Sequence, residues 1–161
     1  SVKKQFGTVP NLFRLASTSP AALEGYLGVV GALSKGSLPA ATRGRIALAV
    51  AEINGCDYCL SAHSYLGMNM AKISSEEIAL NRMGRSGDAK ADAAVRFAVN
   101  VVRDRGRVVA ADVEAVREAG FSDGQIVEII AVAAENVFTN LLNVVAGTEI
   151  DFPVVRAAEA A

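Results

Sequence analysis

The sequence of 161 residues contains no tryptophan, and aromatic side chains of all kinds make up only 6% of it. Large rings often dominate a core, so this core must be built mainly from aliphatic side chains. The chain is nevertheless 52% hydrophobic and long enough to bury a real core as one domain spanning residues 1–161. Its many alanines and short connections favour helices that pack closely on one another.

The chain also lacks an excess of charge of either sign. Its formal net charge is −1, and acidic and basic residues are interspersed, so it offers no electrostatic footprint for nucleic acid or anionic lipid. No hydrophobic run approaches the length expected of a membrane span, and residues 1–7 do not resemble a signal peptide. We therefore expect a cytoplasmic protein with neither a nucleic-acid nor a membrane partner.

Cysteine and histidine are scarce, and all of them lie between residues 56 and 63. Two cysteines in a C-x-x-C spacing, without an export signal, favour a cytosolic thiol pair over a secreted disulfide scaffold. If the segment is helical, Cys56, Cys59 and His63 share one face, because positions i, i+3, i+4 and i+7 form a stripe. A dithiol beside a base is the arrangement that thiol redox chemistry requires.

No segment keeps a two-residue alternation of polar and apolar side chains, whereas helix signals recur along the chain. Serine or aspartate caps precede apolar runs, with capping boxes expected at 74–77 and 122–125, and glycines follow the runs at Gly55, Gly120 and Gly147. The prediction is an all-α, single-domain helical bundle. The expected helices begin or run near residues 11–16, 20–34, 39–53, 56–70, 75, 89, 112–119 and 123–146.

The cysteine segment is suited to a specific reaction if one helix ends at Gly55 and Cys56 lies in the first turn of the next helix. Unpaired N–H groups and the helix dipole then stabilise a thiolate. A thiolate attacks a peroxide oxygen to give a sulfenic acid, the second thiol condenses with it to a disulfide, and an external dithiol reduces that disulfide. Glu52 would lie on the same stripe only if the helix continued through Gly55. Tyr58 is either a packed ring or a hydroxyl donor near the thiols.

Other interpretations of the same residues remain open. A structural disulfide is weak, because a four-residue loop removes little entropy from the unfolded chain. A zinc site could use Cys56, Cys59 and His63 with Glu52 as fourth ligand, although the chain has no second ligand pair. The cysteines could also be inert core residues beside a core histidine. A non-enzymatic redox sensor or binding protein needs the same reactive thiolate as an enzyme, so the sequence does not separate the two.

Two features of the C-terminal half have both functional and structural explanations. A DNA-binding helix-turn-helix over 112–134 is disfavoured, because its recognition helix would carry Asp123 and Glu128 and is otherwise largely apolar. A hairpin of core helices explains this segment better. Asn136, Asn140 and Asn143 could line the site or bond buried carbonyls at a subunit contact, and we favour the structural role.

The segment Asn54-Gly55-Cys56-Asp57-Tyr58-Cys59-Leu60-Ser61-Ala62-His63 resembles the C-x-x-C-x-x-x-H signature of the alkylhydroperoxidase D-like (AhpD-like) proteins. These belong to the carboxymuconolactone decarboxylase superfamily. The resemblance extends over nearly the whole chain, through Phe6-Gly7 to Pro10-Asn11-Leu12, Ser19-Pro20, the asparagine-containing last helix and Asp151-Phe152-Pro153. These segments look like the uncharacterised peroxidase-related branch.

This resemblance implies an all-helical homo-oligomer, a trimer or hexamer, that acts as a peroxidase on a hydroperoxide substrate without a bound cofactor. An external dithiol of the lipoyl type would reduce its disulfide, and the expected protein partner is a lipoyl-bearing protein or a peroxiredoxin. By resemblance, Cys59 forms the sulfenic acid, Cys56 donates a proton and resolves it, and His63 belongs to a proton relay.

The sequence departs from the characterised AhpD enzymes at two places. They carry histidine just before the second cysteine, where this chain has Tyr58. Their relay glutamate lies about three helical turns before the first cysteine, where this chain reads Thr42-Arg43-Gly44-Arg45. Glu52 is the candidate replacement, in an E-x-x-x-C-x-Y-C pattern. The lactone decarboxylase chemistry of the wider superfamily does not use a C-x-x-C pair, and nothing in the sequence supports it.

Overall fold

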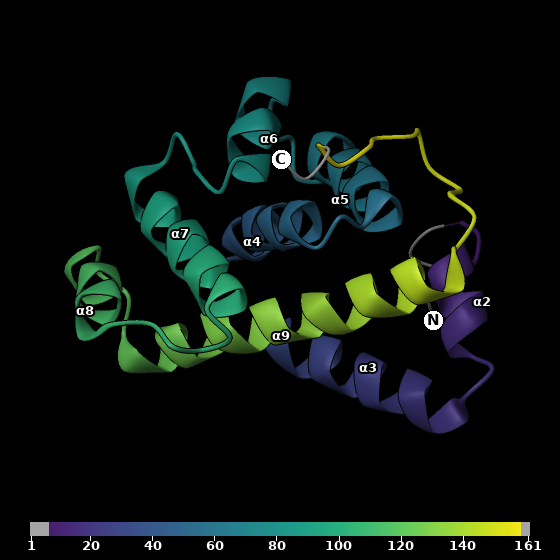
Figure 1. Ribbon diagram of the computed structural model, residues 1–161, viewed down its shortest axis with the longest axis horizontal. Coiled ribbons are helices and arrows are strands. Elements are labelled where there is room, and N and C mark those ends of the chain that lie inside the picture. Colours follow the sequence, from purple (N-terminus) through teal and green to yellow (C-terminus); the bar gives the residue numbers. More distant parts are fainter. Residues whose placement is uncertain (1–6, 159–161) are drawn as a thin grey trace.

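The described part of the chain, residues 7–158 of the computed structural model, is all-α, as predicted, and contains helices joined by turns and loops without a strand. Phe6, which belongs to the N-terminal part of the family resemblance, lies outside the described residues. Figure 1 shows the helices in chain order: α2 (Asn11–Ala16), α3 (Pro20–Leu33), α4 (Ala40–Ile53), α5 (Asp57–Asn69), α6 (Ser75–Arg82), α7 (Ala89–Arg103), α8 (Ala110–Glu118) and α9 (Asp123–Ala146).

The start and stop signals of the sequence act as expected at most helix ends. The Asp88 carboxylate accepts a hydrogen bond from the Ala91 N–H at 2.8 Å. Ser122 and Gln125 form a reciprocal capping box at the start of α9, and Gly147 ends that helix in the left-handed conformation. These local bonds satisfy backbone groups that a helix leaves unpaired at its ends.

The capping box expected at the start of α6 forms only in part. The Ser74 hydroxyl accepts from the Glu77 N–H at 3.2 Å, but the Glu77 carboxylate does not return to the backbone of Ser74. It binds Arg45 of α4 and the turn between α6 and α7 instead. A charged partner on a neighbouring helix competes successfully with a local backbone donor, because charge-assisted hydrogen bonds are the stronger ones.

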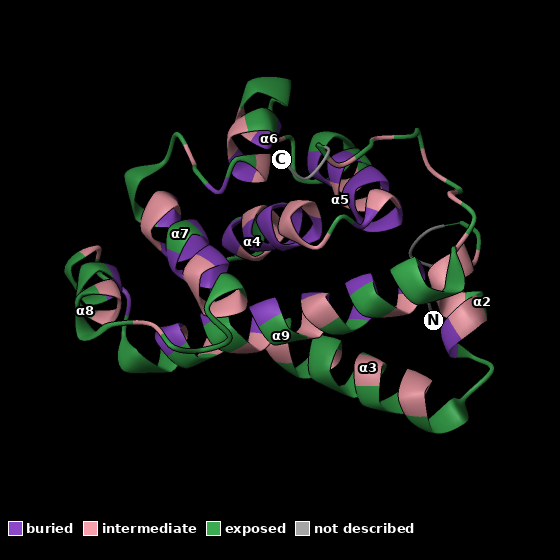
Figure 2. Cartoon of the chain, in the orientation of Figure 1, coloured by how far each residue is buried: buried purple, intermediate pink, exposed green. Residues whose placement is uncertain are grey.

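Helix α4 lies at the centre of the bundle and packs against α5, α6, α7 and α9 (Figure 1). Its consecutive residues Ile46 to Ala51 are all buried, and Figure 2 shows this helix largely in the colour of buried residues. A helix that is apolar on all sides is one that neighbours surround. The cysteine-bearing helix, α5, therefore packs against a helix that its neighbours surround.

Helix α9 corrects one expectation from the sequence. It is 24 residues long and contains an 18-residue window with a mean hydropathy of 1.6, so one segment of the described chain does reach the length and composition of a membrane span. A core helix passes the same test, and α9 behaves as one: Ile126, Ile129 and Ala133 are buried in the main hydrophobic cluster. The α8–α9 hairpin likewise buries Val116 and Phe121 in that cluster.

Helix α3 is mostly apolar yet has no buried residue. It packs along α9 on the side opposite the α4 centre, and Figure 2 shows it entirely in the colours of intermediate and exposed residues. The exposed apolar side chains of the pair include Leu27, Val29 and Val30 of α3 and Ile130, Phe138, Leu141 and Val144 of α9. We call this surface the α3–α9 face.

Candidate redox site

The two helices that meet at the cysteines are separated by a sharp turn. Asn54 is the C-cap of α4, Gly55 has a φ of +63°, and Cys56 is the N-cap of α5. The Asn54 side chain also donates a hydrogen bond of 2.9 Å to Asn140 of α9, which fixes the turn against the long helix. Glu52 and Cys56 therefore belong to different helices and do not share a stripe.

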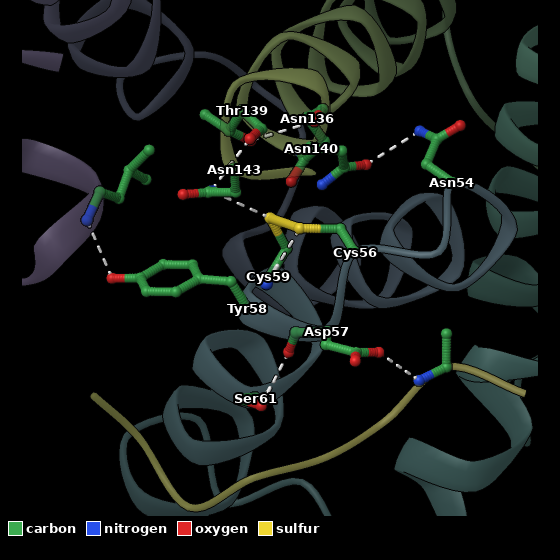
Figure 3. Close-up of a disulfide and its surroundings, with 12 residues drawn as sticks. Asn54, Cys56, Asp57, Tyr58, Cys59, Ser61, Asn136, Thr139, Asn140 and Asn143 are labelled. Atoms are coloured by element: carbon green, nitrogen blue, oxygen red, sulfur yellow. Dashed lines mark hydrogen bonds between the residues drawn. A yellow bond between two sulfur atoms is a disulfide. The ribbon is translucent and has the colours of Figure 1, made fainter. Parts of the chain in front are cut away.

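Cys56 and Cys59 are joined in a disulfide at the N-terminus of α5 (Figure 3). The Cys59 N–H donates to the Cys56 sulfur at 3.2 Å, and the Asn143 amide of α9 donates to the Cys59 sulfur at 3.4 Å. The two residues are only 1% and 3% exposed. Donors aimed at both sulfurs favour the charged thiolate when the pair is reduced.

Cys59 and His63 line the same cavity, of about 80 Å³. The rest of its wall is mostly apolar and comes from α2, α3, α5, α9 and the tail: Pro10, Leu12, Phe13, Tyr26, Tyr58, Ala62, Leu66, Thr139 and Phe152. Burial in these surroundings lowers the pKa of His63 to about 4, so the imidazole is neutral at pH 7 and keeps one nitrogen free to accept a proton. A thiolate at Cys59 would raise that pKa through attraction of opposite charges.

Cys56 lines a different hollow, of about 310 Å³, on the other side of the disulfide. This hollow is more polar, and its walls include Asp57, Thr148 and Arg156 as well as Asn143. The C-terminal tail forms part of it, because Asp57 binds Arg156 at 2.6 Å and accepts from the Ala157 N–H at 2.8 Å. That backbone hydrogen bond, with the Arg156 guanidinium, holds the pKa of the Asp57 carboxyl below its usual range.

The Tyr58 hydroxyl turns away from the sulfurs toward the chain ends (Figure 3). It donates to the Asp151 carboxylate at 2.9 Å and accepts from the Leu12 N–H at 3.1 Å. Its ring still contributes to the Cys59 cavity and packs edge-on against Phe152, with the centroids 5.9 Å apart. In this position Tyr58 connects α2, α5 and the tail around the cavity.

The Glu52 carboxylate is also engaged elsewhere. It pairs with Arg82 of α6 at 2.6 Å and accepts from the Ala158 N–H of the tail at 2.7 Å. It does not line the cavity that contains Cys59 and His63. Among residues 7–158, no cluster of three or more His, Cys, Asp or Glu side chains is arranged to hold a metal ion. The four-ligand zinc site considered from the sequence therefore lacks its geometry in this structure.

The three asparagines of α9 divide between the roles considered from the sequence. Asn143 donates to its own helix, at the Thr139 carbonyl, and also to the Cys59 sulfur. Its carbonyl oxygen is buried with no hydrogen-bond partner among the described residues. Asn140 holds the α4–α5 turn through Asn54. The preference for a purely structural role was therefore incomplete, because Asn143 reaches the redox pair.

One ionisable group near the site was missed from the sequence. Glu135 of α9 is partly buried beside Asn136, and its carboxylate accepts the Asn136 amide at 2.9 Å. Burial raises the pKa of Glu135 to about 7, although a hydrogen bond from Tyr26 of α3 opposes that effect. A single carboxylate in a long apolar stretch of α9 is the signal that could have found it.

The fold and the buried cysteine pair beside a histidine define an AhpD-like helical protein. Carboxymuconolactone decarboxylase family sequence features match residues 19–104, more than half of the chain, and the chain belongs to that family. No curated protein sequence matched. Among solved structures, the chain is similar to the alkylhydroperoxidase AhpD core of an uncharacterized peroxidase-related protein from Ralstonia eutropha JMP134, with 27% identity and a TM-score of 0.83 over 93% of this chain and 81% of that one.

Two further structures share the fold. An uncharacterized peroxidase-related protein from Silicibacter sp. TM1040 has 25% identity and a TM-score of 0.74, over 96% of this chain and 81% of that one. The debrominase Bmp8 has 18% identity and a TM-score of 0.79, over 93% of this chain and 82% of that one, a likeness of fold alone. The predicted family resemblance and fold are therefore confirmed.

Proposed function

We propose that this protein is a thiol-dependent peroxidase that reduces alkyl hydroperoxides through Cys59 and Cys56. The observation that carries the proposal is the placement of the Cys59 sulfur in one cavity with the neutral imidazole of His63, while Cys56 lies within bonding reach of it. The mostly apolar cavity wall suits a small organic hydroperoxide. The peroxidase-related relatives support the same class of reaction.

The proposed cycle moves two electrons in each turn. The Cys59 thiolate attacks the terminal peroxide oxygen, the O–O bond breaks, and the alkoxide leaves as the alcohol after it takes a proton. Cys56 then attacks the sulfur of the Cys59 sulfenic acid, and water leaves as the disulfide forms. An external dithiol reduces that disulfide by exchange and becomes a disulfide itself, so protein dithiol plus hydroperoxide gives protein disulfide, alcohol and water.

We assign a role to each group from where it lies around the two sulfurs. His63 accepts the thiol proton of Cys59 through its free ring nitrogen. The Asn143 amide, which donates to the Cys59 sulfur, stabilises negative charge there. Cys56 accepts the Cys59 N–H at the N-terminus of α5, so its own thiolate is also favoured for the resolving step. Tyr58 and Glu52 act on this site through the tail and neighbouring helices rather than on the reacting atoms.

The electron donor is proposed to be a small dithiol of the lipoyl type, free or carried by a partner protein. The hollow beside Cys56 is the side from which such a donor would approach, because the cavity beside Cys59 is much smaller. A non-enzymatic redox sensor uses the same disulfide and is the alternative. Its support is the attachment of the C-terminal tail to Asp57, the residue just after Cys56.

A thiol count tests the proposed cycle directly. The fully reduced protein should lose two thiols per chain when it is treated with one equivalent of tert-butyl hydroperoxide, and dihydrolipoamide should restore both. Continued consumption of peroxide while dihydrolipoamide lasts would identify an enzyme. A single oxidation without turnover under any dithiol supply would identify the sensor, and thiols that do not react with peroxide would overturn both functions.

We also propose that copies of the chain associate through the α3–α9 face into a trimer or hexamer. This face is extensive and apolar, and α3 has no fully buried residue in its own chain. Multi-angle light scattering is expected to give a mass three or six times that of the chain. Val30→Glu, which places a charge on the face and leaves the core unchanged, should lower that mass, and a wild-type protein of single-chain mass would refute the association.

A further inference from the structure

The start of α2 is held by side chains from distant parts of the chain. Pro10, the N-cap residue, makes no side-chain cap. The Asn11 N–H donates instead to the Asp151 carboxylate at 2.9 Å, in the C-terminal tail that lies beside α2 (Figure 1). The Leu12 N–H donates to the Tyr58 hydroxyl at 3.1 Å. Both N–H groups are among those that a helix leaves unpaired at its start, so the placement of α2 depends on these two partners.

Asp151 joins the three segments at this point. Its Oδ2 atom accepts from the Asn11 N–H, and its Oδ1 atom accepts from the Tyr58 hydroxyl at 2.9 Å. A carboxylate at the start of a helix is favoured by the helix dipole as well as by the hydrogen bond itself. The carboxylate therefore ties α2 and α5 to the tail. We call the four bonded residues the clasp: Asn11, Leu12, Tyr58 and Asp151.

The segments that the clasp joins form one side of the cavity beside Cys59. Leu12 and Phe13 of α2 and Phe152 of the tail line that cavity, and the Phe152 ring packs edge-on against Tyr58. These three side chains are partly exposed, whereas Cys59 is buried, so a molecule that enters from this side meets them before the sulfur. The cavity measures about 80 Å³. An apolar cavity of about 150 Å³ is known to hold benzene, so this one has no room for a phenyl group.

We propose that Phe152 and the clasp determine the size of the molecule that reaches the Cys59 sulfur. The Phe152 ring fills the space that a larger organic group would need, and the clasp keeps α2 and the tail together around that ring. Small aliphatic hydroperoxides are therefore preferred over hydroperoxides that carry a phenyl group. The preference among hydroperoxides rests on the proposed peroxidase function, but the size limit at Cys59 does not.

Alkylation of a protein with a single thiol tests the size limit without peroxide. Cys56→Ser leaves Cys59 as the one thiol of the chain. Iodoacetamide and iodoacetanilide carry the same reactive group, and the second adds a phenyl ring. The ratio of the iodoacetanilide rate to the iodoacetamide rate, followed by mass spectrometry of the intact protein, should rise about tenfold when Phe152→Ala is added to this background. Asp151→Ala, which removes the centre of the clasp, should raise the ratio by a smaller factor.

Two matched controls come from the same tail. Val155 packs against the same hydrophobic cluster as Phe152 but is not part of the cavity wall, so Val155→Ala should leave the ratio unchanged. Glu149 contacts α2 through its backbone carbonyl, which Glu149→Ala keeps, so this variant should also leave the ratio unchanged.

An unchanged ratio in Phe152→Ala would overturn the inference, as would an equal rise in Val155→Ala, which would show that any loosening of the tail admits the larger reagent. A rise in Phe152→Ala with none in Asp151→Ala would remove the clasp from the proposal. If Phe152→Ala does not fold, Asp151→Ala against Glu149→Ala decides the question, because both variants remove one carboxylate from the tail.

Turnover extends the same test to the proposed reaction. Cumene hydroperoxide differs from tert-butyl hydroperoxide by a phenyl group in place of one methyl group. In wild type its kcat/KM should be about tenfold lower, and Phe152→Ala should remove most of that difference. An altered alkylation ratio in a protein that turns over neither hydroperoxide would refute the peroxidase function and keep the size limit. Turnover of both with the same preference in wild type and Phe152→Ala would refute the size limit and keep the function.

Discussion

Cys59→Ser is expected to lower hydroperoxide turnover by at least about 10³-fold, because a serine hydroxyl at neutral pH is neither ionised nor able to form a sulfenic acid. The serine oxygen would still lie in the cavity beside His63 and Asn143, so binding and fold should change little. Peroxide consumption in the presence of dihydrolipoamide measures the effect. Activity close to that of wild type in this variant would contradict the assignment of Cys59 as the attacking thiol.

Cys56→Ser is the matched control, because it removes the other sulfur of the same disulfide. It should still react once with hydroperoxide and then stop, since no thiol is within reach to resolve the sulfenic acid. Mass spectrometry after trapping with dimedone should find the adduct on Cys59. An adduct that instead forms on Cys56 in the Cys59→Ser variant, at a comparable rate, would reverse the two roles.

Glu77→Ala is expected to lower the free energy of unfolding by about 3 kcal/mol. This should be the largest loss of stability from the removal of any one partly exposed side chain of the protein. The carboxylate joins α6 to Arg45 of α4 at 2.8 Å, to the Ser86 hydroxyl at 2.6 Å and to the Gly87 N–H at 2.8 Å. Its side chain is only 15% exposed, so water replaces these contacts poorly. Urea unfolding followed by circular dichroism measures the loss.

The same carboxylate should make stability depend on acid. Burial alone would raise the pKa of Glu77, but hydrogen bonds from Ser86, Gly87, Asn81 and Arg45 outweigh it and lower the pKa to about 2. A lowered pKa in the folded state means that the stabilisation is complete above the ordinary value of 4.5 and is lost as the pH falls toward 2. Glu76→Gln, at the exposed neighbouring position, should change little, and an equal loss in both variants would refute the role of Glu77.

Much of the helical framework could be predicted from the sequence because its signals are local. Ser122 with Gln125, Asp88 and Gly147 each act within four residues of a helix end, and the structure places them as caps or stops. Where a partner from a distant segment competed, the local prediction was incomplete, as Glu77 shows by binding Arg45 rather than returning to its own helix end. The expectation that no segment reaches the length of a membrane span was wrong for α9, which has that length and hydropathy although its buried side chains belong to the core.

The sequence by itself determined that Cys56, Cys59 and His63 lie close together at the start of one helix, since a three- or four-residue spacing fixes what one helical turn brings together. Only the tertiary structure decided what surrounds them. Asn143 reaches the Cys59 sulfur from a helix that lies 84 residues further along the chain. Glu52 and Tyr58 are drawn to Arg82 and Asp151. Such partners depend on how α9 and the tail pack against α4 and α5, and a local spacing of residues carries no information about that packing.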